Sequence, residues 1–155
     1  MLIAINLNSL QMIFSNLCFI SLDLQDNAHL ITQLLTTAFL SVLFIQSGMD
    51  KVIDKEGNLS WLTGHFSNSP LKNLVPFLFV SITVIELLAG FGTLVGAVCI
   101  LFFDNSSIAF IGTLLSAVAL LMLFFGQRIA KDYAGAQSLV SYFILTILTL
   151  VLLSW

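Results

Sequence analysis

Four long apolar stretches, separated by short polar segments, dominate the hydrophobic pattern of this chain. The first covers residues 30–49 and contains no charged side chain. At a rise of about 1.5 Å per residue, a helix of this length extends about 30 Å, the thickness of the hydrocarbon core of a bilayer. The other three stretches are residues 76–103, 107–125 and 136–155. The pattern predicts an all-α membrane protein, a bundle of four transmembrane helices.

The composition requires a lipid environment. Hydrophobic residues make up 59% of the 155 residues and charged residues only 8%, with a mean hydropathy of +1.07. Soluble domains contain about 25% charged residues, and one of this size could not bury so much apolar surface. The formal net charge of −3 includes no run of basic residues. We therefore expect contact with the lipid bilayer and exclude nucleic-acid binding.

The N-terminal segment, residues 1–28, does not fit this pattern. Its first 22 residues are uncharged, but asparagine, serine and glutamine repeatedly interrupt the apolar residues. We expect an N-terminal interfacial helix or a tail in residues 1–28, followed by a transmembrane bundle in residues 29–155. A fifth membrane-spanning helix is the alternative.

The segment between the first two apolar stretches, residues 57–73, is too polar and too rich in Gly, Ser, Asn and Pro to cross a bilayer. Within it, Leu59, Leu62 and Phe66 recur at helical spacing beside Trp61. This spacing predicts a short amphipathic helix that lies in the headgroup region.

The basic residues predict the orientation of the bundle. They all fall between the first and second stretches or between the third and fourth: Lys51, Lys55, Lys72, Arg128 and Lys131. The positive-inside rule places these two connections in the cytoplasm. It places the tight polar turn expected at residues 104–106, together with the C-terminus, on the outside.

Small and polar residues indicate which faces of the helices pack together, because lipid provides no hydrophobic drive for helix association. One face of the second stretch carries Thr83, Glu86, Ala89, Gly90, Thr93, Gly96 and Ala97, beside a GxxxG pair formed by Gly92 and Gly96. The other stretches carry Gln33, Thr37, Gly48 and Lys51, then Gly112, Thr113, Ser116 and Ala117, and finally Ser138, Tyr142 and Thr149. We expect these four faces to meet inside the bundle.

Glu86 is the candidate catalytic residue, because an acid within a membrane helix is costly and must face the bundle interior. Two roles stay open for it: handling a proton, or hydrogen bonding between helices. If Pro76 lies at the cytoplasmic surface, Glu86 lies about 15 Å below it. The residues expected at that depth, as hydrogen-bond partners and as the lining of a cofactor pocket, are Ser41, Ser116, and Tyr142 or Thr146.

Lys51 is expected mainly as an anchor at the membrane surface. An ion pair with Glu86 is the alternative, if the overlong second helix protrudes from the bilayer. No metal or covalently bound cofactor is expected. The histidines and cysteines lack the spacing of haem, zinc or dithiol sites: His29, His65, Cys18 and Cys99.

Two segments resemble one protein family. FIQSGMDKV at residues 44–52 is similar to the end of the first transmembrane helix of the DoxX family, and IELLAGFGTLVG at residues 85–96 resembles the second helix of that family. The intervals that carry the resemblance are those between Gly48, Lys51, Pro76, Glu86, Gly90 and Gly96. The resemblance covers residues 30–155. It implies a multi-pass fold in the bacterial cytoplasmic (inner) membrane.

The same resemblance implies a function. Some members of the family are associated with quinone-linked sulfur oxidation or with membrane oxidoreductase assemblies. We therefore expect a quinone-linked or redox-associated membrane subunit. Because the sequence carries no redox centre of its own, electrons must come from a protein partner. The alternative is a non-catalytic scaffold or assembly factor in which Glu86 only joins helices.

Overall fold

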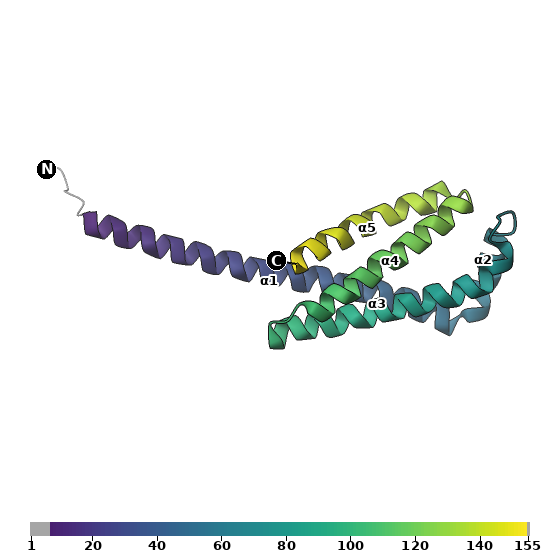
Figure 1. Ribbon diagram of the computed structural model, residues 1–155, viewed down its shortest axis with the longest axis horizontal. Helices are drawn as coiled ribbons and strands as arrows, with labels where there is room; N and C mark the ends of the chain where they lie inside the picture. The colour runs from purple at the N-terminus through teal and green to yellow at the C-terminus, as the bar shows by residue number, and fades with distance from the viewer. Residues whose placement is uncertain (1–6, 155) are drawn as a thin grey trace. The chain divides into compact units, whose positions relative to one another are not determined.

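The computed structural model describes residues 7–154, and almost all of them are helical. The helices are α1 (Leu7–Ile53), α2 (Lys55–His65), the short 3-10 helix η1 (Lys72–Leu74), α3 (Val75–Phe103), α4 (Ser107–Ile129) and α5 (Tyr133–Leu153), as Figure 1 shows. Side chains are described for residues 11–18 and 27–154. No strand occurs within this part of the chain, so the expected all-α class is confirmed.

Among the described residues, four helices are long and apolar enough to cross a membrane. They occupy Asn27–Ile53 within α1, Lys72–Phe103, Ser107–Ile129 and Tyr133–Leu153. Each includes nearly all of one apolar stretch predicted from the sequence and extends past it by a few residues. The protein is therefore a multi-pass membrane protein whose apolar helices contact the lipid bilayer.

The chain divides into two compact units, Met1–Thr32 and Gln33–Trp155. In the first unit, the described part of the expected N-terminal segment is helical, and α1 runs without interruption from Leu7 to Ile53. Residues 1–6 of that segment lie outside the described residues. An interfacial position for this segment stays a prediction.

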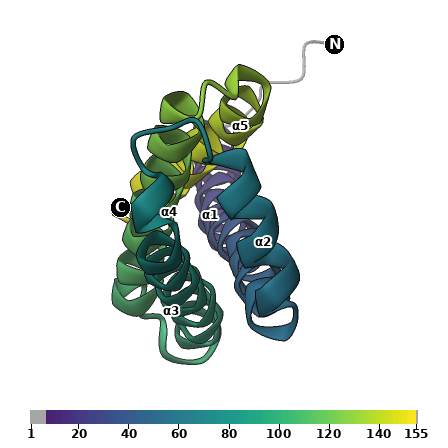
Figure 2. The ribbon, with the colours of Figure 1, turned by 90° about the vertical axis from the view of Figure 1, so that its right-hand side faces the viewer.

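Helices α3 and α4 lie side by side in the second unit (Figures 1 and 2), and their closest approach runs along glycines. A methyl group added to Gly96 would collide with the backbone of Ala109, and one added to Gly112 would collide with the backbone of Thr93. Gly92 faces the Cα of Gly112. The predicted GxxxG pair thus forms a backbone-to-backbone contact, which is how small residues stabilise helix pairs in lipid.

Helix α1 also packs on α3 through close contacts at glycines. A methyl group on Gly90 would meet the backbone nitrogen of Ile45, and one on Gly48 would meet the side chain of Leu87. These two contacts fix how far α1 is displaced along α3. They bring Gly48 to the level of residues 86 and 87.

The predicted buried faces are largely confirmed. The buried residues of α3 include Thr83, Glu86, Ala89, Gly90, Thr93 and Gly96, and those of α4 include Gly112, Thr113, Ser116 and Ala117. One prediction was wrong: Ser138 on α5 is exposed, its hydroxyl donating to the carbonyl of Gly135, whereas Ala97, Lys51 and Tyr142 are half-buried. The hydroxyl of Ser138 is thus satisfied within its own helix and needs no interhelical partner.

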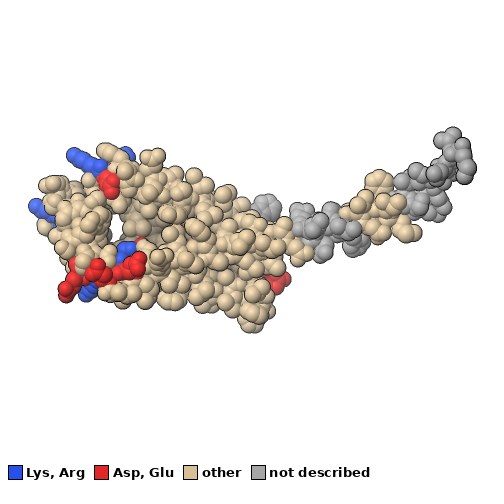
Figure 3. All heavy atoms as spheres, turned by 180° about the vertical axis from the view of Figure 1, so that it is seen from behind, with Lys and Arg blue, Asp and Glu red and all other residues tan. Residues whose placement is uncertain are grey.

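The two ends of the bundle differ in charge. Figure 3 shows basic and acidic side chains gathered together at one end, where α2 and the connection between α4 and α5 lie. This end is called the basic end because it carries all the Lys and Arg residues of the chain. At the other end, Ser106 Oγ donates to the carbonyl of Leu153 at 3.2 Å, and Gln33 Nε2 donates to the carbonyl of Leu152 at 2.8 Å. The tight turn there is confirmed, with Asp104 in the left-handed conformation at φ 50°. The positive-inside rule makes the basic end the cytoplasmic one, an assignment that stays a prediction.

Candidate functional site

Glu86 forms a buried ion pair that joins α1 to α3. Its side chain is fully buried, and Lys51 Nζ lies 2.9 Å from its Oε2. Oε2 has no regular hydrogen bond, so this contact is electrostatic. Ser47 Oγ donates to Oε1 at 3.1 Å, and Lys51 Nζ donates to the carbonyl and the hydroxyl of Ser47 at 3.1 and 2.9 Å. The carboxylate thus has both a counter-ion and a donor inside the protein.

The direction of helical side chains explains how Lys51 reaches Glu86. Side chains lean toward the N-terminus of their own helix. Lys51, near the C-terminal end of α1, therefore leans into the bundle, while Glu86 leans toward the basic end because α3 is antiparallel to α1. The interpretation of Lys51 mainly as a surface anchor was wrong, since only 16% of its side chain is exposed and it forms the ion pair.

The predicted alignment of Glu86 with Ser41 was also wrong. Glu86 lies opposite Ser47, not Ser41, and the two serines are six residues apart, which is about 9 Å along a helix. The estimate took Pro76 to be at the membrane surface. In the structure, the contacts of Gly48 with Leu87 and of Gly90 with Ile45 set the level of α1 against α3, and they bring Ser47 rather than Ser41 beside Glu86.

Two of the other residues predicted around Glu86 form hydrogen bonds within their own helices. Ser116 Oγ donates to the carbonyl of Gly112 at 3.0 Å, and Thr146 Oγ1 donates to the carbonyl of Tyr142 at 2.8 Å. Ser41 is buried, and the ring of Tyr142 lies 6.4 Å from that of Phe39. Ser41, Ser116 and Tyr142 line neither the apolar pocket described below nor a cavity between α4 and α5.

Ser47 is the site residue that the sequence reasoning missed. The sequence feature that could have identified Ser47 is its position four residues before Lys51, which places both side chains on one face of α1. The contacts around Glu86 are suited to holding α1 against α3. Glu86, too, lines neither of these cavities.

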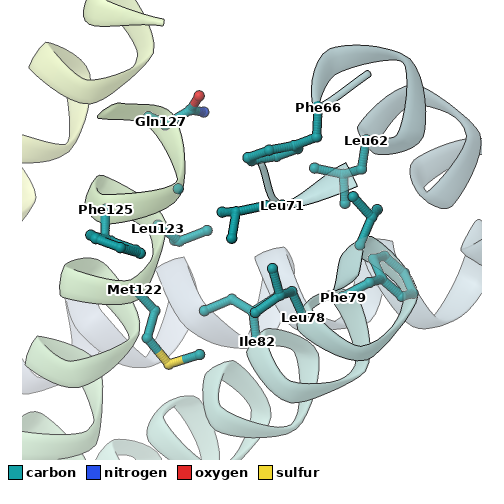
Figure 4. Close-up of a pocket in the computed structure, with 12 residues that line it drawn as sticks. Leu62, Phe66, Leu71, Leu78, Phe79, Ile82, Met122, Leu123, Phe125 and Gln127 are labelled. Carbon is teal, nitrogen blue, oxygen red and sulfur yellow. The ribbon is translucent and has the colours of Figure 1, made fainter. Parts of the chain in front are cut away.

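A separate, apolar pocket lies at the basic end, between α2, α3 and α4 (Figure 4). Its volume is about 170 Å³. Side chains from three parts of the chain line it: Leu62, Phe66 and Leu71 from α2 and the following loop, Val75, Leu78, Phe79 and Ile82 from α3, and Met122, Leu123, Phe125, Gly126 and Gln127 from α4. Gln127 is the polar side chain at its edge.

A polar cluster beside the pocket holds the end of α2 against the end of α4. His65 Nε2 lies 3.1 Å from Gln127 Oε1 and 3.8 Å from Asp132 Oδ2. The ring of Trp61 stacks on that of His65 with centroids 4.8 Å apart. Asp132 also caps the start of α5, because its carboxylate accepts a hydrogen bond from the backbone of Gly135 at 2.8 Å. The predicted short helix is thus present, and its position in the headgroup region stays a prediction. Leu62 on α2 and Phe66 just after it line the pocket.

No family model, curated protein or solved structure matches this chain. No group of three histidine, cysteine or acidic residues that could hold a metal ion occurs among the described residues.

Proposed function

We propose that this protein is a membrane subunit that binds a quinone headgroup in the apolar pocket beneath α2 and acts with a protein partner that carries the redox centre. The observation that carries the proposal is the pocket itself. It combines apolar walls with one polar edge at the basic end of the bundle. Ligand pockets commonly have this character, with a few polar groups that orient a mostly apolar ligand.

The polar edge suits a quinone carbonyl. A quinone headgroup is a flat ring that carries two carbonyl oxygens, and each of these accepts hydrogen bonds. When His65 Nε2 donates to Gln127 Oε1, the amide nitrogen of Gln127 remains available as a donor. The ring would lie against Leu78 and Met122, and the isoprenoid tail would extend into the lipid.

The pocket gives Glu86 a smaller role than the sequence suggested. Glu86 does not line this pocket, and its carboxylate is held by Lys51 and Ser47. We therefore assign it to helix packing rather than to proton transfer with the quinone. The resemblance to the DoxX family supports the redox association and the bacterial inner membrane as the location.

A non-catalytic scaffold is the second candidate. The ion pair between Lys51 and the fully buried Glu86 favours it, because such a pair holds two helices in one fixed arrangement and offers no open site. In a scaffold, the pocket would hold only lipid.

The test is to purify the protein in mild detergent and to measure the quinone that co-purifies. Leu78→Trp, which fills the pocket, is expected to remove bound quinone, and Gln127→Leu is expected to lower it. Leu88→Trp is the matched control, because Leu88 lies on the same helix and is exposed to lipid. Glu86→Gln is expected to retain the quinone.

Two results would contradict the quinone proposal. One is that the wild-type protein carries no quinone and takes none up from quinone-containing vesicles. The other is that Leu78→Trp and Leu88→Trp bind quinone equally. A stable partner complex that falls apart without this chain, in a protein that binds no quinone, would establish the scaffold.

A further inference from the structure

An exposed heptad pattern runs along the face of α1 that points away from the bundle. Its residues follow the alternating spacing of four and three that defines positions a and d of a coiled coil. They are Leu35, Phe39, Val42, Gln46, Met49 and Ile53. All six side chains are exposed, and between 38% and 76% of each apolar one is accessible. Phe39 also contacts the ring of Tyr142 on α5, with centroids 6.4 Å apart, and 47% of its side chain remains accessible.

Gln46 is the exceptional residue of this seam. Among the described residues its carboxamide has no hydrogen-bond partner. It lies one helical turn, about 6 Å, from Asp50, inside the membrane-crossing segment Asn27–Ile53. Its side chain leans toward the N-terminus of α1, away from the basic end and deeper into the membrane. An amide in this position loses its hydrogen bonds to water unless another helix supplies a partner.

We propose that this seam of α1 is the contact surface of a homodimer, in which Gln46 pairs with Gln46 of a second copy. Two copies in one membrane have the same orientation, so their α1 helices run parallel and identical residues lie at the same depth. In a symmetric parallel pair, each a position meets its own counterpart across the two-fold axis.

A glutamine is self-complementary in this arrangement, because the amide nitrogen of each copy donates to the carbonyl oxygen of the other. A buried polar residue at one a position is also the known means by which coiled coils select register and a two-stranded state. The 3.5-residue period of the seam predicts a left-handed crossing. The dimer does not depend on the quinone proposal, because the seam and the pocket share no residue.

Disulfide cross-linking of the full-length protein in lipid vesicles tests this surface. In a background with Cys18→Ser and Cys99→Ser, Val42→Cys is expected to form a dimer on mild oxidation. Leu88→Cys, on the exposed face of α3, is the control and is expected to stay monomeric. Equal cross-linking at both positions would show random collision and overturn the proposal.

A second experiment tests the role of Gln46 in dimerisation. Gln46→Leu is expected to weaken dimerisation about 3- to 30-fold, the range for hydrogen bonds between membrane helices. Association is measured by energy transfer between labelled copies at increasing protein-to-lipid ratios. Gln137→Leu is the matched control, because Gln137 is an exposed glutamine on α5, outside the seam. An unchanged dimer in Gln46→Leu, or a monomer at every ratio, would overturn the proposal.

Discussion

Replacing Lys51 by methionine would remove the counter-ion of a fully buried carboxylate while keeping most of the volume of the side chain. Glu86 is 0% exposed and Lys51 is 16% exposed. After the change, Glu86 would retain only the hydrogen bond from Ser47 Oγ. We expect Lys51→Met to lower the free energy of unfolding by about 3–5 kcal/mol, the cost of leaving one partner of a buried pair alone.

Removing the charge of Glu86 instead of that of Lys51 is expected to cost less stability. In Glu86→Gln, the ammonium of Lys51 still donates to the carbonyl and hydroxyl of Ser47, and 16% of the Lys51 side chain is exposed. We expect a loss of about 1–3 kcal/mol. The double variant Lys51→Met with Glu86→Leu is expected to lie within about 1 kcal/mol of the wild type, because apolar replacement of a whole buried pair is often neutral.

Reversible unfolding in mixed micelles of a mild detergent and dodecyl sulfate, followed by circular dichroism, measures these free energies. Lys55→Met is the matched control, because Lys55 is exposed and the change should alter stability by no more than about 0.5 kcal/mol. Equal effects of Lys51→Met and Lys55→Met would refute the buried ion pair. So would a double variant as unstable as Lys51→Met.

Three further predictions use the same unfolding assay or limited proteolysis. Gly96→Ala should lower the free energy of unfolding by about 1–3 kcal/mol, because the added methyl group meets the α4 backbone. Gly64→Ala should raise it by up to about 1 kcal/mol, because the space around Gly64 is open. Effects of the same sign would contradict the packing of α3 on α4. His65→Ala removes the contact with Gln127 and should speed proteolysis after α2 about fivefold, for a hydrogen bond of about 1 kcal/mol; an unchanged rate would mean that this contact does not hold α2. Asp104→Val should destabilise by about 1–2 kcal/mol, because a branched side chain resists the left-handed conformation at φ 50°; a neutral effect would exclude that turn.

Properties that depend on neighbouring residues along the chain were predictable. The length and hydropathy of residues 107–125 identified α4 without any tertiary information. The angular positions of Thr83, Gly90 and Gly96 identified the buried face of α3, because a helix has a fixed period. The amphipathic spacing of Leu62 and Phe66 predicted that a short helix would lie between the first two membrane helices.

The sequence by itself therefore determined four apolar helices, their inward faces and a buried acid among them, since each of these is local in the chain. Only the tertiary structure decided which residues meet that acid. The close contacts of Gly90 with Ile45 and of Gly48 with Leu87 set the displacement of α1 along α3, and this displacement placed Ser47 and Lys51 beside Glu86. The pocket also required tertiary structure, because its walls come from segments far apart in sequence that meet only when α2 folds back over α3 and α4.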